Sequence, residues 1–370
     1  MDIKPFDDVR NTPYSNINET INVENKNVLK SLTFNDSTKF SDPLLAEGIL
    51  TNAQESPLGV WDLHRNDIMG KHINIAIIDQ PCAMNHPEYD GKFLAYLDYL
   101  PKEDKEEEKN ISSMHGPAVM SLLVGQNCGV APEAKVLYGA VPSWNHDSFY
   151  YADALRGIIR FNESQQDHKK IKFVAVSAAP SGKASQFVKN TAMWDEAVKQ
   201  AQANGIVVVD CTDSNGFVAP GYVSPVTNRF VKGFPLKNKE KSYFKTFLEK
   251  VELWAKAKVF DKMIQKTNKL KPIEYNKKDQ IYVPTSYRTV AESYDNKHFG
   301  YAYYSQAGLS FGVPYTVGVL ALGQQINRDL SAKELKRLLI ETSKKGVINP
   351  KKFIAAVKET VKDEENEEGR

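Results

Sequence analysis

The chain has 370 residues, of which 41% are hydrophobic and 25% charged, a composition typical of a folded globular protein rather than of a disordered or membrane-spanning chain. Its 48 Lys and Arg residues nearly balance 46 Asp and Glu residues, so no strong net charge favours nucleic acid as a partner. The three cysteines, Cys82, Cys128 and Cys211, lack CxxC spacing, which fits neither a disulfide framework nor a structural zinc site.

The N-terminal part of the chain predicts where the protein resides. Met1 to Asp8 lack the basic start and apolar run of a secretory signal. No stretch reaches the roughly 20 apolar residues that a transmembrane helix needs. We therefore expect a cytoplasmic protein without a membrane partner. Residues 1–55 are rich in Asn, Asp, Ser and Thr, which predicts a loop-rich leader that either wraps the body or is disordered.

The following part alternates between predicted strands and helices. The apolar run at 73–78 is typical of a strand buried on both faces of a parallel sheet, and it ends on Asp79. Periodicity then predicts helices over 114–124, 149–161 and 186–204, and strands over 135–140, 173–177 and 206–211. This alternation predicts an α/β fold with a central, mostly parallel, doubly wound sheet.

Two segments depart from the alternation. Lys102 to Lys109 is densely charged and predicts a solvated surface loop. Residues 218–275 are rich in Lys and aromatic residues, and apolar positions from Phe244 to Met263 follow helical spacing. They predict an inserted amphipathic helix that packs on the body, with a partner or membrane surface as the alternative. Further helices are predicted over 310–325, 331–345 and 350–361, before a frayed acidic tail at 362–370.

Three polar residues stand at the ends of these predicted elements. Asp79 follows the first buried strand, at the edge where open α/β sheets bind ligands. His115 begins one helix, and Ser310 begins another at its positive terminus. Each position alone is more often structural than catalytic. A serine becomes a nucleophile when a histidine takes its proton and a carboxylate orients that histidine, so the three together predict a catalytic triad.

The motifs around these residues resemble those of the subtilase family. Ile75 to Asp79 with Asn85-His86-Pro87-Glu88 resembles the family's Asp motif, and His115-Gly116-Pro117-Ala118-Val119 resembles its His motif. Gly308 to Tyr315 is similar to the family's Gly-Thr-Ser-Met-Ala-Ser-Pro-His. The order Asp, His, Ser is the subtilisin order. The resemblance implies a three-layer α/β/α subtilisin-like domain over 56–361 and a serine endopeptidase activity.

The resemblance also implies a substrate site. Val176 to Gly182 resembles the family's Ser-Leu-Gly-Gly strand, whose edge pairs with an extended peptide. Ser177, Ala178 and Ala179 would then bind a peptide or protein substrate in extended conformation, although an ordinary edge strand is the simpler interpretation. Asp213 is a candidate for the pocket wall that favours Lys or Arg before the cut, unless it is a solvated loop residue.

The oxyanion region departs from the family pattern. Subtilases place an Asn side chain after the strand equivalent to 206–209, where an ungapped match puts Ser214 and a one-residue bulge puts Asn215. Both candidates stay open. Gln80-Pro81, Pro117 and Leu309 also replace the usual neighbours of the triad.

These departures leave a second hypothesis, a catalytically weak or inactive subtilase-derived scaffold that binds a peptide or a partner protein. The sequence contains no Asp/Asn/Gly-rich loop of the kind that binds calcium. No Gly-rich phosphate loop follows the first strand. We therefore expect no metal ion and no cofactor.

Overall fold

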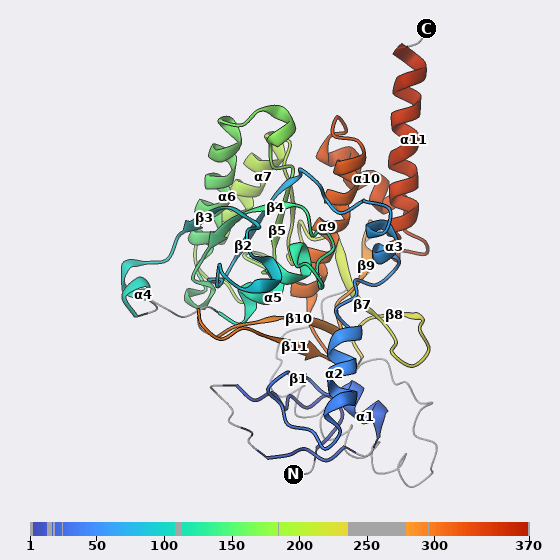
Figure 1. Cartoon of the computed structure of the whole chain (residues 1–370). Coiled ribbons are helices and arrows are strands. Elements are labelled where there is room, and N and C mark those ends of the chain that lie inside the picture. The colour runs from blue at the N-terminus through green and yellow to red at the C-terminus, as the bar shows by residue number, and fades with distance from the viewer. Residues whose placement is uncertain are drawn as a thin grey trace.

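A parallel five-stranded sheet forms the centre of the computed structural model, which describes residues 3–12, 17, 19–23, 25–107, 113–183, 185–235, 279–294 and 296–368. The strand order is β3-β4-β2-β5-β6, and the first four of these strands are labelled in Figure 1. The strands are β2 (Asn74–Asp79), β3 (Phe93–Asp98), β4 (Lys135–Ala140), β5 (Phe173–Val176) and β6 (Val207–Val209). Asp79 therefore lies at the carboxyl end of the central strand.

Helices cover both faces of the sheet because β2 is apolar on both faces. Ile75 and Ile77 pack into one core with α5 (His115–Val124) and α9 (Leu309–Ile326). Ala76 and Ile78 point the opposite way, as alternate residues of a strand must, and pack with α6 (Ser148–Glu163) and α7 (Thr191–Ala203). The α/β fold and its layered, parallel sheet are confirmed.

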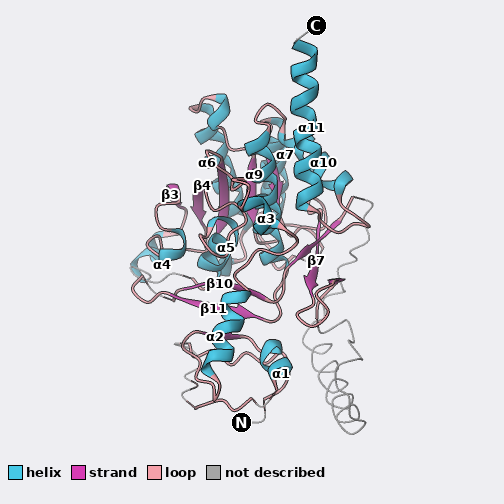
Figure 2. Ribbon diagram, turned by 45° about the vertical axis from the view of Figure 1, so that its right-hand side comes forward, coloured by secondary structure: helices cyan, strands magenta, loops and turns pink. Residues whose placement is uncertain are grey.

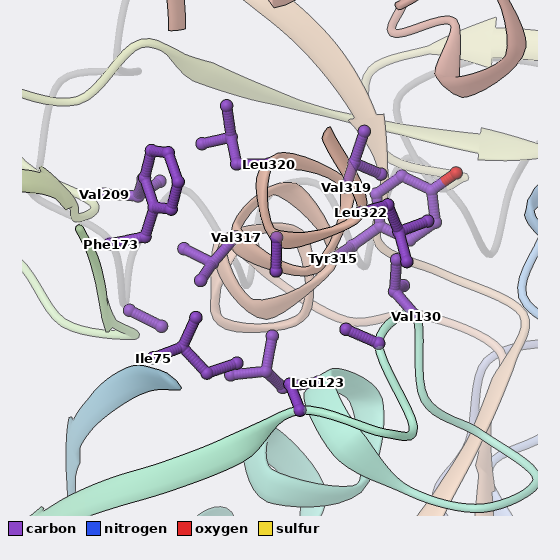
Figure 3. Close-up of a cluster of buried hydrophobic side chains, with 14 of the residues drawn as sticks. Ile75, Leu123, Val130, Phe173, Val209, Tyr315, Val317, Val319, Leu320 and Leu322 are labelled. Carbon is purple, nitrogen blue, oxygen red and sulfur yellow. The ribbon is translucent and has the colours of Figure 1, made fainter. Parts of the chain in front are cut away.

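Helix α9 runs through the larger core, as Figure 3 shows. Every residue from Phe311 to Gln324 is buried, which is expected of a helix that is apolar on all sides. Its glycines allow close approach: a Cβ added to Gly318 would lie 2.5 Å from Val130 Cβ. Helix α10 (Ala332–Thr342) and helix α11 (Pro350–Glu368) pack beside it, and Ser331 opens α10 with a capping box.

The described part of the leader is folded and packs at one end of the body. It contains α1 (Lys26–Ser31), β1 (Phe34–Asn35) and α2 (Pro43–Asn52), and α3 (Val60–His64) follows. Strand β1 joins the antiparallel hairpin of β10 (Arg288–Glu292) and β11 (Gly300–Tyr304), with Phe34 opposite Tyr303. The apolar side chains of the leader form a separate small core with Tyr303. Figure 2 shows α1 and α2 at the end of the molecule opposite α11, whereas α3 packs against α11.

The stretch predicted as a helical insertion begins instead with strands. β7 (Val218–Val223) pairs with β8 (Phe230–Lys232) and, in parallel, with β9 (Ile281–Pro284). Val218, Tyr222 and Val223 favour a strand, but Pro220 and Gly221 between them disguise it in the sequence. The helix predicted around Phe244 to Met263 lies outside the described residues.

Several predicted boundaries also change. Helix α7 begins at Thr191 rather than 186, because Lys189 bridges to Asp147 and Asn190 takes a left-handed φ of 52°. Part of the charged segment forms α4 (Lys102–Glu107), and the helix predicted to end at 361 continues to Glu368. Short 3-10 helices occupy Pro87–Tyr89, Ser143–Asn145 and Asp167–Lys169. Within the described ranges, no helix is both long and apolar enough to cross a membrane.

Candidate active site

Asp79 and His115 form the best-defined contact of the site. His115 Nδ1 lies 2.6 Å from Asp79 Oδ1, and the backbone N–H of Gln80 donates to the same oxygen at 2.7 Å. Asp79 is buried and His115 is partly exposed. Because a carboxylate accepts hydrogen bonds, Nδ1 carries the proton and Nε2 remains the basic nitrogen of neutral His115.

The pKa of His115 depends on its burial and on its contact with Asp79. Burial lowers the pKa of His115, but the charge of Asp79 and its hydrogen bond outweigh burial and raise that pKa above the ordinary 6.5. Thiols and phenols surround Asp79, and burial raises the pKa of each of them: Cys82, Tyr138, Tyr151 and Cys211. These groups stay neutral near pH 7, so the negative charge next to His115 is that of Asp79.

Ser310 and Ser177 make two reciprocal hydrogen bonds. The Ser177 hydroxyl donates to the Ser310 carbonyl at 2.9 Å, and the Ser310 hydroxyl donates to the Ser177 carbonyl at 3.1 Å. The Ser310 carbonyl would normally accept from the residue four positions on, which is Pro314 and has no N–H. Ser177 supplies the missing donor, so this pair fixes the start of α9 against the end of β5.

The first turns of α5 and α9 lie next to each other. Ala118, one turn after His115, packs in the same buried cluster as Phe311, which follows Ser310. In the described part of the chain, no hydrogen bond joins the His115 ring to the Ser310 hydroxyl, which is bound to Ser177 instead. The structure therefore brings all three predicted triad residues to one region and links two of them directly.

The predicted substrate strand is held by the neighbouring loops. The N–H of Cys211 donates to the Ala178 carbonyl at 2.9 Å, and the Ser185 hydroxyl donates to the Ala179 carbonyl at 2.5 Å. Ser177 is buried, while Ala178 and Ala179 are partly exposed. The segment after β5 is thus fixed in position with its two alanines at the surface.

Asp213 faces this same segment. Its Oδ2 accepts a hydrogen bond from the N–H of Lys183 at 3.4 Å, and a Cβ added to Gly182 would collide with its carboxylate. Gly182 has a φ of +98°, which favours glycine. The loop after β6 and the loop after β5 therefore meet at Asp213.

Both oxyanion candidates have other partners: Asn215 binds β6 and α7, and Ser214 binds within its own loop. Asn215 Nδ2 donates to the Val208 carbonyl at 3.1 Å, and its Oδ1 accepts from Gln202 at 3.3 Å. Ser214 is exposed, and its hydroxyl reaches Thr212 Oγ1 at 3.5 Å.

Sequence reasoning missed Asp210, which joins this loop to α7 through hydrogen bonds. It is fully buried and accepts from Thr212 Oγ1 at 2.7 Å and from Trp194 Nε1 at 3.2 Å. Burial raises its pKa. The signal that would have found it is a carboxylate directly after an apolar strand, the same signal that identified Asp79. Among the residues described, no three His, Cys, Asp or Glu side chains are grouped as they would be around a metal ion.

The parallel sheet with Asp79 at its central strand defines a protein of subtilisin-like architecture. A family model described as the subtilase family matches residues 70–217, a range that contains Asp79, His115 and the segment after β5. Over these residues the chain is similar to the subtilase family, and the two curated relatives described next extend this similarity.

Two curated relatives carry names of characterised proteins. Thermitase of Thermoactinomyces vulgaris is 24% identical over 198 residues, which are 53% of this chain and 65% of thermitase. Serine protease AprX of Bacillus subtilis (strain 168) is 24% identical over 290 residues, which are 74% of this chain and 61% of AprX. The chain thus spans less than two thirds of the length of either relative.

Solved structures share the fold at lower identity. The prenylagaramide maturation protease PagA is 16% identical with a TM-score of 0.51, covering 81% of this chain and 98% of PagA. The PatG macrocyclase domain is 16% identical with a TM-score of 0.50, covering 81% of this chain and 94% of that domain. A PatG macrocyclase structure in complex with peptide is 15% identical with a TM-score of 0.50, covering 81% of this chain and 95% of that chain.

Proposed function

We propose that this protein is a serine endopeptidase in which Asp79, His115 and Ser310 act as the catalytic triad. The observation that carries the proposal is the 2.6 Å contact between His115 Nδ1 and buried Asp79, because it leaves Nε2 as a base oriented by a carboxylate. The nucleophile is the hydroxyl of Ser310, which lies at the start of α9 next to the first turn of α5.

In this mechanism, His115 Nε2 takes the proton of Ser310 as its Oγ attacks the carbonyl carbon of the substrate. The C–N bond then breaks, and His115 gives the proton to the departing amine. Water, deprotonated by His115, hydrolyses the ester of Ser310 and releases the second product. The Ser310 hydroxyl must first turn from the Ser177 carbonyl towards His115, a change that a rotation about χ1 allows.

The oxyanion would be held by the N–H of Ser310 and by a side chain of the loop after β6. The first N–H groups of a helix lack intrahelical acceptors, so that of Ser310 is available. Asn215 is the stronger of the two side-chain candidates because an amide is a good oxyanion donor, but it must leave the Val208 carbonyl. A missing donor would lower the rate by about 100- to 1,000-fold, the size of the loss in subtilisin.

The substrate that fits this site is a peptide or protein segment in extended conformation. It would lie along Ser177, Ala178 and Ala179 as an added strand. The PatG macrocyclase, a protein of the same fold, has been solved in complex with peptide, which supports a peptide as the ligand. Asp213, where the loops after β5 and β6 meet, would favour Lys or Arg before the cut. A cytoplasmic location remains a prediction.

Labelling with a fluorophosphonate probe tests the proposal, with intact-mass readout on the native protein, Ser310→Ala and Ser164→Ala. We expect one adduct on the native chain and on Ser164→Ala, and none on Ser310→Ala. The Ser164→Ala variant is the matched control because it removes an exposed serine hydroxyl at the C-terminal end of α6, outside the proposed site. No adduct on folded native protein would overturn the enzyme proposal and favour the non-catalytic binding scaffold.

A further inference from the structure

The side chain of Gln80 joins three elements around the Asp79–His115 pair. Its Oε1 accepts a hydrogen bond from the Ser113 hydroxyl, and its Nε2 donates to the Ser143 hydroxyl. Ser113 Oγ in turn accepts from the N–H of His115 at 2.9 Å. A single amide group therefore connects the end of β2 with the start of α5 and with the loop that follows β4.

The backbone of Gln80 takes part in the same arrangement. Its N–H donates to Asp79 Oδ1 at 2.7 Å, and its carbonyl accepts from the Tyr138 hydroxyl at 2.5 Å. The next carbonyl, that of Pro81, accepts from the N–H of Ser113 at 3.0 Å. The Asp79 carboxylate thus binds the backbone of Gln80, and the backbone of His115 binds the Ser113 hydroxyl that the Gln80 side chain contacts.

Both ends of the amide group are bound. Oε1 faces the Ser113 hydroxyl and Nε2 faces the Ser143 hydroxyl. An amide with fixed partners at both ends restricts the side chain to a single rotamer, and this is the condition for holding reacting groups at a defined distance. Asp79 and His115 belong to different elements, so their separation depends on such connections.

We propose that Gln80 is a positioning residue that sets the spacing of Asp79 and His115 by tying the end of β2 to the start of α5. The inference rests on the proposed function for its catalytic meaning, but the spacing itself can be measured without activity. Small displacements of reacting groups cost about 100-fold in rate. We therefore expect Gln80→Met, which keeps the length and removes both hydrogen bonds, to slow fluorophosphonate labelling by about 10- to 100-fold.

Gln80→Glu provides the conservative rescue. Both serine hydroxyls can donate to a carboxylate, so this variant keeps the connections and should recover most of the labelling rate at high pH. Its added negative charge raises the pKa of His115, which moves the low-pH limb of the rate profile to higher pH. The charged group that faces His115 in the native protein is Asp79, since the thiols and phenols around it stay neutral.

Gln325→Met is the matched control because Gln325 also bridges segments from within α9. Its Oε1 accepts from the N–H groups of Met69, Gly70 and Lys71, and its Nε2 donates to the Asp67 carbonyl. The variant should lower thermal stability without slowing the labelling. Equal slowing by Gln325→Met and Gln80→Met would overturn the positioning role, because the effect would then be general destabilisation.

An NMR titration of His115, assigned with His115→Gln, separates this inference from the proposed function. We expect Gln80→Met to lower the pKa of His115, because a looser contact weakens the effect of Asp79. If the native protein takes no label but the pKa of His115 is still lower in Gln80→Met than in the native protein, the positioning role stands and the protease proposal fails. A native pKa together with native labelling in Gln80→Met would overturn the inference.

Discussion

The guanidinium of Arg10 lies 4.9 Å from the ring centroid of Tyr304, and its Nη1 donates to the hydroxyl of that tyrosine at 2.5 Å. The same nitrogen also binds Glu292 at 3.1 Å. Tyr304 packs edge-on against Phe311, with ring centroids 5.2 Å apart. The leader therefore contacts the hairpin that leads directly into the helix of Ser310.

Arg10→Ala should destabilise the protein by about 3 kcal/mol, because it leaves the buried Glu292 carboxylate without its cation. Urea unfolding followed by circular dichroism would measure the change. Arg65→Ala is the control, since Arg65 pairs with Asp62 at an exposed position, and we expect its midpoint to stay nearly native. Equal midpoints for the two variants would contradict a structural role of the leader.

The labelling rate should rise with pH through the pKa of His115, because the protonated imidazole cannot accept the proton of Ser310. That pKa lies above the ordinary 6.5 because of Asp79. In Asp79→Asn, burial lowers the pKa of His115 without an opposing charge, so the low-pH limb of the labelling-rate profile should move to lower pH. The maximum labelling rate should fall by about 10,000-fold. A rate profile measured from pH 5 to 9 tests this, and an unshifted limb would contradict the assigned base.

The same pair predicts how stability depends on pH. The pKa of His115 is raised by folding, so its contribution to stability is fully present below the unfolded pKa near 6.5 and is lost as pH rises through the folded pKa. The Tm of Asp79→Asn should therefore lie furthest below the Tm of the native protein at pH 6, and the difference should become smaller at higher pH. A constant difference across this range would show that the pair does not titrate as described.

Gly116→Ala should disrupt the site because a Cβ there would lie 2.6 Å from the Pro81 carbonyl and 2.8 Å from the Gln80 carbonyl. Backbone atoms cannot move aside as a flexible side chain does, so α5 must shift away from the end of β2. We expect a loss of about 1–3 kcal/mol together with slower labelling.

Gly48→Ala is the control for this substitution. An added Cβ at Gly48 in α2 meets nothing within 4 Å, and Ala is the better helix residue by about 0.5–1 kcal/mol. We expect slightly higher stability and native labelling. Native behaviour of Gly116→Ala would show that the two segments are not packed as described.

Asn215→Ala should slow labelling by about 100- to 1,000-fold if its amide leaves the Val208 carbonyl to bind the oxyanion. Ser214→Ala should then change the rate by less than about threefold. Stopped assays of probe consumption on both variants decide between the candidates. The reverse result would assign the role to Ser214.

The sequence predicts Asp79 at the end of a strand and His115 at the start of a helix, and both positions agree with the structure because these elements are strongly patterned. The leader could not be predicted in the same way, since β1 gains its structure from β11, which is far away in the sequence. The hydroxyl pair of Ser310 and Ser177 follows from the missing N–H of Pro314, but the partner that replaces it depends on the fold. The connections made by Gln80 depend likewise on three elements that meet only after folding.

The strand added by the leader imposes an order on folding during synthesis. The hydroxyl of Tyr303 donates to the carbonyl of Lys30, which precedes it by 273 residues. At about 5–20 residues per second, the ribosome makes this partner tens of seconds after the leader. The apolar side chains of the leader must remain uncovered during that time, so a nascent chain would be most exposed to aggregation and to chaperones until its last third emerges.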